Sequence, residues 1–101
     1  MLDWAVAFLL TVVLEMPCVV ACAPRGVRRR AALDSLLVNA CTHPVAWLAV
    51  NSDALSWTAT EAAVVVVEAL VYRWITRMPW SRAGAASLLA NGVSAGSAFL
   101  F

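Results

Sequence analysis

Four polar residues lie near the midpoints of four apolar stretches of the chain: Glu15, His43, Glu68 and Asn91. An ionisable side chain in the middle of a bilayer is costly, so such residues usually face one another or a water-filled cavity. Counted from the ends of the stretches at about 1.5 Å per helical residue, the four fall near a common plane. Carboxylate, imidazole and amide groups at one depth predict a single site that binds a proton or a small cation.

Further polar residues accompany the central four at helical spacings. Tyr72 lies four residues after Glu68 and Ser94 lies three after Asn91, so each pair shares a helix face. Glu61 lies on the same stripe as Glu68, nearer to the outer surface. We expect five polar residues to surround the central site: Asn39, Thr42, Glu61, Tyr72 and Ser94.

The same donor groups suit a divalent metal ion of intermediate hardness, for which Glu15, His43 and Glu68 are the candidate ligands. The chain has no local metal signature such as His-x-x-x-His or Cys-x-x-Cys, so this hypothesis depends on residues from separate segments converging. A proton is the simpler ligand. Burial disfavours the charged form of a carboxylate, and a neighbouring histidine exchanges protons near neutral pH.

The composition indicates an integral membrane protein. Hydrophobic residues make up 63% of the chain, charged residues only 13%, and the mean hydropathy is +0.85, which excludes an ordinary soluble domain. Each apolar stretch has the roughly 20 residues that a helix needs to cross a bilayer. We predict an all-α, polytopic four-helix bundle forming one transmembrane domain, with spans at about 4–23, 32–50, 57–75 and 83–101.

All basic residues are arginines in or beside the first and third connections: Arg25, Arg28, Arg29, Arg30, Arg73, Arg77 and Arg82. The positive-inside rule makes these connections cytoplasmic and leaves both termini outside. Asp34 is then an acid just outside the membrane on the cytoplasmic side. Arginines beside a span set topology or meet anionic lipid, so we expect the lipid bilayer as a partner and no nucleic acid.

In length, number of spans and a glutamate in the first span, the chain resembles the small multidrug resistance transporters. That family works as dimers and exchanges protons for cationic drugs at the glutamate, so the resemblance implies a proton and substrate site at Glu15. Pro17, the additional acids Glu61 and Glu68, and the valine run 64–67 depart from the family's pattern. The resemblance is therefore one of architecture.

A second pattern covers all four spans: Glu15-Met16-Pro17, Asn39-x-x-Thr42-His43-Pro44, Glu61 to Glu68 with Tyr72, and Asn91-x-x-Ser94. It resembles that of uncharacterised small bacterial membrane proteins. The resemblance implies a multi-pass protein of the bacterial plasma (inner) membrane and carries no activity with it.

The leading functional hypothesis is a membrane protein that binds and passes a proton or small cation. The alternative is an accessory or assembly subunit of a larger membrane complex, packed through Gly84, Gly92 and Gly96. A homo-oligomer or a larger complex is expected in both cases. An intramembrane hydrolase is a weaker third hypothesis, because the CAAX-type proteases that share these residue types have a paired glutamate signature and a second histidine. We therefore assign no catalytic residues and do not expect an enzyme.

Overall fold

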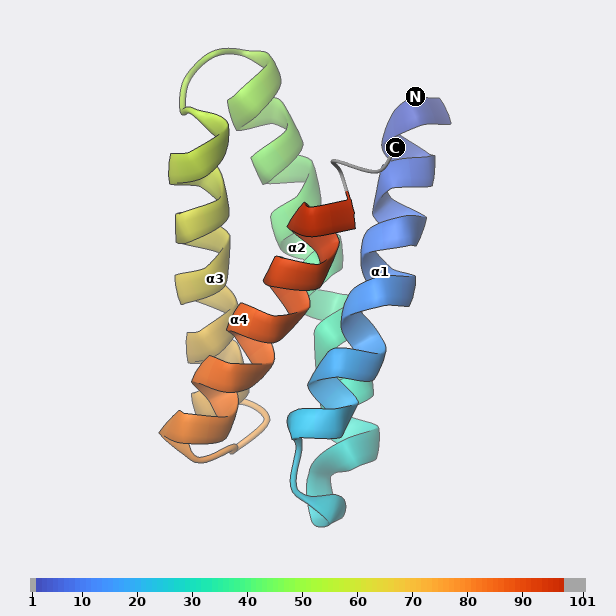
Figure 1. The fold of residues 1–101 in the computed structure, drawn as a ribbon, viewed down its shortest axis with the longest axis vertical. Coiled ribbons are helices and arrows are strands. Elements are labelled where there is room, and N and C mark those ends of the chain that lie inside the picture. Colours follow the sequence, from blue (N-terminus) through green and yellow to red (C-terminus); the bar gives the residue numbers. More distant parts are fainter. Residues whose placement is uncertain (1, 98–101) are drawn as a thin grey trace.

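Four α-helices succeed one another along the chain in the computed structural model, which describes residues 2–97 (Figure 1). They are α1 (Leu2–Cys22), α2 (Arg28–Asn51), α3 (Trp57–Trp74) and α4 (Trp80–Ser97), and a short 3-10 turn, η1 (Arg25–Val27), joins α1 to α2. The described residues contain no strand. The all-α prediction is confirmed, and each predicted span overlaps one of the four helices; residues 98–101 of the last predicted span lie outside the described residues.

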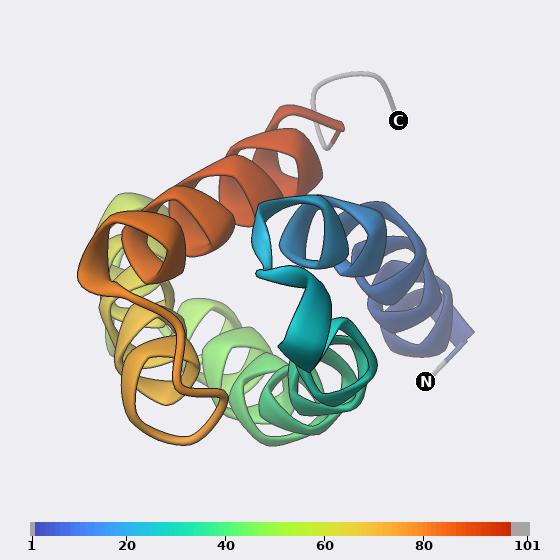
Figure 2. The ribbon, with the colours of Figure 1, turned by 90° about the horizontal axis from the view of Figure 1, so that it is seen from below.

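The helices form a ring in which each contacts its two neighbours. Helices α1 and α3 both pack against α2 and α4, whereas the described backbones of the diagonal pairs stay apart (Figure 2). Successive helices run antiparallel. The start of α1, the α2–α3 loop (residues 52–56) and the end of α4 share one end of the bundle, which we call the terminal end. The opposite end, with η1 and the α3–α4 link (residues 75–79), is the arginine end.

Local sequence signals mark the helix boundaries. Ser56 caps α3, its hydroxyl accepting a hydrogen bond from the Ala59 N–H at 3.1 Å. Arg77 has a left-handed backbone with φ of 67°, and the Met78 N–H turns back to the Tyr72 carbonyl to close α3. Pro79 then stands directly before α4, where its fixed backbone angle suits a helix start.

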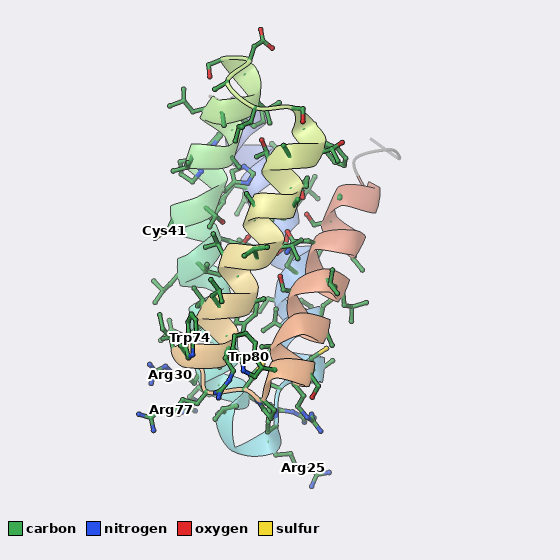
Figure 3. All side chains as sticks on the ribbon, turned by 90° about the vertical axis from the view of Figure 1, so that its left-hand side faces the viewer. Arg25, Arg30, Cys41, Trp74, Arg77 and Trp80 are labelled. Atoms are coloured by element: carbon green, nitrogen blue, oxygen red, sulfur yellow. The ribbon has the colours of Figure 1, made fainter. Side chains whose placement is uncertain are left out.

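The arginines gather at the arginine end, and Figure 3 shows Arg25, Arg30 and Arg77 there. Arg82 at the start of α4 donates from Nη1 to the Cys22 carbonyl at 3.0 Å, which satisfies a free carbonyl at the end of α1. A cation at a helix C-terminus also complements the helix dipole. The charge segregation predicted from the sequence is therefore present in the fold.

Among the described residues, the bundle buries as many polar side chains as apolar ones and leaves many large apolar side chains exposed. Large apolar side chains face outward, with Val13, Val45 and Leu48 each about two-thirds exposed. Polar side chains face inward, and among the described residues the buried ones are Glu15, Asp34, Ser35, Asn39, Thr60, Glu68, Thr76, Ser87 and Asn91. In soluble proteins acidic side chains are almost never fully buried.

One described helix, over Trp4–Cys22, is long and apolar enough to cross a membrane by its length and composition. The charged residues of α2 and α3 explain why these two helices have lower hydropathy. Helix α2 begins with arginines and carries Asp34, and α3 carries Glu61, Glu68 and Arg73. Direct support for a membrane span therefore comes from α1.

Candidate functional site

A cavity of about 280 Å³ lies between the helices in the half of the bundle next to the terminal end. It extends from the level of Glu15 and Asn91 outward to Asn51 and Trp57, beside the α2–α3 loop. Most of the residues predicted for the site line it: Glu15, Asn39, Thr42, His43, Glu61, Asn91 and Ser94. Polar side chains from all four helices thus converge on one space.

Two carboxylates lie near the inner end of this cavity, of which Glu15 lines it and Glu68 does not. Glu15 on α1 is 1% exposed and Glu68 on α3 is fully buried. The Asn91 amide on α4 donates from Nδ2 to Glu68 Oε2 and also to the Ser87 carbonyl, so its orientation is fixed. One oxygen of each carboxylate, Oε1 in both cases, has no hydrogen-bond partner.

The two carboxylates lie close enough together to repel each other when both are ionised, and Glu61 adds to that repulsion. The ion pair found in residues 2–97 joins Arg30 to Asp34 at the arginine end, so no basic side chain of the described chain neutralises the buried glutamates. Like charges in a desolvated site cannot both persist bare. The two carboxylates can therefore both be ionised only if a positive charge compensates them.

His43 lines the same cavity but contacts other partners. Its half-buried ring packs among Trp4, Phe8 and Trp47, with centroid separations of 5.6, 5.4 and 6.3 Å. Its Nε2 atom is buried without a hydrogen-bond partner. The structure therefore brings His43 to the cavity wall within an aromatic cluster, and shows no hydrogen bond from it to a carboxylate.

The metal hypothesis finds no support. No group of three or more His, Cys, Asp or Glu side chains in residues 2–97 is arranged to hold a metal ion. The proposed ligands Glu15, His43 and Glu68 do not form a coordination sphere because His43 lies in its aromatic cluster, while Glu68 is directed to Asn91.

Two predicted residues, Glu68 and Tyr72, do not line the cavity and lie on its inner side, toward the arginine end. Tyr72 is fully buried, and its hydroxyl lies beside the Ser35 hydroxyl of α2. Between α3 and α4, the Ser87 hydroxyl donates to the Val65 carbonyl at 2.6 Å. The polar interior therefore continues beyond the cavity into the packed half of the bundle.

Asp34, expected just outside the membrane on the cytoplasmic side, is buried in the fold. Asp34 is 6% exposed, and its Oδ2 accepts hydrogen bonds from Thr76 Oγ1 at 2.6 Å and from Arg30 Nε at 3.3 Å. Sequence reasoning also missed Ser35 and Thr76 as interior residues. Helical spacing could have found Ser35, which precedes Asn39 by four residues on α2, whereas Thr76 lies in the α3–α4 link, beyond the end of α3.

No protein-family model matches the chain, and no curated protein or solved structure shows significant similarity to it. The function of the chain must therefore be inferred from the geometry of the bundle and the chemistry of its interior.

Proposed function

We propose that the chain is a polytopic membrane protein whose four helices all cross the bilayer. The outward-facing apolar residues support this, because lipid is the solvent in which they are stable. The bundle is 39 Å long, close to the roughly 40–45 Å of a bilayer with its headgroup regions. Trp74 and Trp80 lie at the arginine end (Figure 3), as expected of indole rings at a membrane interface.

The positive-inside rule places the arginine end in the cytoplasm. Arg29 and Ser52 are both exposed and lie at opposite ends. In a variant without the three native cysteines, an impermeant thiol reagent should label Arg29→Cys from the cytoplasm and Ser52→Cys from outside. Labelling of both cysteines from one side would refute the four-span arrangement, and the reverse pattern would refute its orientation.

We propose further that the protein binds and passes a proton or a small cation at Glu15 and Glu68. The observation that carries this proposal is the pair of buried, mutually repelling carboxylates without a basic partner at the inner limit of a polar cavity. A cluster with a purely structural role would satisfy its own charges within the bundle. This pair instead needs a mobile positive charge, and the cavity gives such a charge a route from the terminal end.

Flux into reconstituted vesicles tests the proposal. Glu68→Gln and Glu15→Gln should each reduce proton- or cation-driven flux to the background of empty vesicles, because an amide keeps the shape of the side chain but cannot exchange a charge. Asp53→Asn, in the exposed α2–α3 loop, is the matched control and should transport like the wild type. Unchanged flux in both glutamine variants would refute the role of the carboxylates.

The accessory-subunit hypothesis is supported by the outer surface of α4. Gly92 and Gly96 are exposed, and a Cβ atom added at either would meet nothing within 4 Å. This Gly-x-x-x-Gly surface is unused within the bundle and would allow close approach of another helix. Absence of wild-type flux under every proton and cation gradient, together with loss of an oligomer in mild detergent on Gly92→Leu, would favour this second function.

A further inference from the structure

Below the cavity, a column of buried polar side chains continues toward the arginine end. Glu68 and Tyr72 are fully buried and lie one helical turn apart on α3, while Ser35 on α2 is 1% exposed. The Tyr72 hydroxyl lies beside the Ser35 hydroxyl and within electrostatic range of Glu68 and Asp34. Asp34 stands at the end of the column, 6% exposed.

The polar atoms along this column lack partners outside it. Glu68 Oε1, Tyr72 Oη and Ser35 Oγ are all buried, and the Tyr72 and Ser35 hydroxyls have no neighbour to bond other than each other. Buried polar groups are normally satisfied, so each exception requires an explanation. Two hydroxyls in succession between the Glu68 and Asp34 carboxylates suit a column that exchanges protons, directly or through small ordered waters.

We infer that Glu68, Tyr72, Ser35 and Asp34 form a proton relay that connects the cavity site to the arginine end. This inference rests on the proposed function and narrows its substrate to the proton. The Glu68 carboxyl gives its proton to Tyr72 Oη while the Tyr72 O–H proton passes to Ser35 Oγ and the Ser35 proton passes to the Asp34 carboxylate. Glu68 is left as a carboxylate that takes its next proton from the cavity, and Asp34 releases the one it received.

The surroundings of the column explain why a proton is the species that passes. Val19, Met78 and Ala83 are fully buried in this half of the bundle. A small metal cation needs several oxygen ligands or its own water shell, whereas the column offers single hydroxyls in succession. A proton needs only the hydroxyls, each of which accepts one proton and donates another.

Charged neighbours define the two ends of the relay. Glu68 faces Glu15 from α1 and the Asn91 amide from α4, and Glu61 precedes it on its own helix. Asp34 faces Thr76 and Arg30. Because the Arg30 side chain is 58% exposed, the ion pair places the final carboxylate next to water at the arginine end.

Proton flux in vesicles that contain a pH-sensitive dye, driven by a potassium diffusion potential, tests the relay. Tyr72→Phe and Ser35→Ala remove one hydroxyl each and should lower the flux by about a hundredfold, the lower end of what a positioned proton-transfer group contributes. Ser87→Ala is the matched control, because Ser87 is equally buried but its hydroxyl bonds to the Val65 carbonyl away from the column. This control should keep wild-type flux when the flux is divided by the amount of folded protein. The size of the unfolding transition in detergent measures that amount.

The outcomes separate the relay from the function on which it rests. If Glu68→Gln abolishes proton flux while Tyr72→Phe and Ser35→Ala conduct like the wild type, the relay is refuted and the carboxylate site stands. A Ser87→Ala variant as impaired as Ser35→Ala would also refute the relay, since the losses would then reflect packing. Absence of proton flux in the wild type would overturn both proposals.

Discussion

The two halves of the bundle differ in what fills the space between the helices. In the half next to the arginine end, alanines allow the helices to approach closely, and Ala31, Ala83 and Ala86 are fully buried. In the half next to the terminal end, polar and aromatic side chains such as His43 and Trp57 surround a cavity. The helices are of similar length throughout, so side-chain size and polarity decide where the bundle is closed.

Hydrogen bonds between distant parts of the chain reinforce the closed half. Thr76 bonds to Asp34, and Arg82 bonds to the Cys22 carbonyl. In the open half, His43 of α2 packs against the Trp4 and Phe8 rings of α1. The carboxylates of Glu15 and Glu68 lie at the boundary, where Glu15 lines the cavity and Glu68 is buried on its inner side.

Enlarging an alanine should have opposite consequences in the two halves. Ala86→Leu inserts a large side chain into a fully packed position and should destabilise the bundle by about 1 to 3 kcal/mol or more. Ala95→Leu, at the cavity wall, should have little effect on the free energy of unfolding because the cavity accommodates the added volume. Denaturant titration in detergent measures both. Equal destabilisation by the two variants would mean that the halves are packed alike.

Removing a buried threonine hydroxyl should lower the free energy of unfolding more when the hydrogen bond of that hydroxyl joins two distant segments of the chain. Thr76→Val leaves Asp34 without its 2.6 Å hydrogen bond and should cost about 1 to 2 kcal/mol of unfolding free energy. Thr60→Val is the control, because the Thr60 hydroxyl bonds to the Ser56 carbonyl one turn away, next to the cavity. A loss for Thr60→Val as large as that for Thr76→Val would show that the bond between segments does not help to close the arginine end.

Glycine substitutions at the left-handed residues of the two turns should differ least in their effect on the free energy of unfolding. Arg77 in the α3–α4 link has a φ of 67°, and Asp53 in the α2–α3 loop has a φ of 60°. Arginine is strained in this region whereas aspartate tolerates it. Arg77→Gly should therefore raise the unfolding free energy by up to about 1 kcal/mol, and Asp53→Gly by less, since glycine's greater freedom when unfolded offsets part of each gain. Thermal unfolding that ranks the two variants in the reverse order would contradict this.

Helix periodicity and depth were sufficient to predict the four helices and the meeting of Glu68 with Asn91, because both depend on regular spacing along each segment. The position of Asp34 was not predictable from its neighbours. Its arginine-rich surroundings favour exposure, and its partner Thr76 lies 42 residues away in the chain. The surroundings of His43 were missed for a similar reason, since its aromatic contacts Trp4 and Phe8 come from another helix. Tertiary packing decides such positions.

Thiol labelling at two alanine positions tests most directly whether the cavity next to the carboxylates is accessible from the terminal end of the bundle only. Ala46 lines the cavity and Ala86 is fully buried in the closed half. In sealed vesicles and a cysteine-free background, an impermeant reagent should label Ala46→Cys from the side of the terminal end alone, and Ala86→Cys from neither side. Failure to label Ala46→Cys from that side, or labelling of Ala86→Cys from the arginine end, would contradict the account.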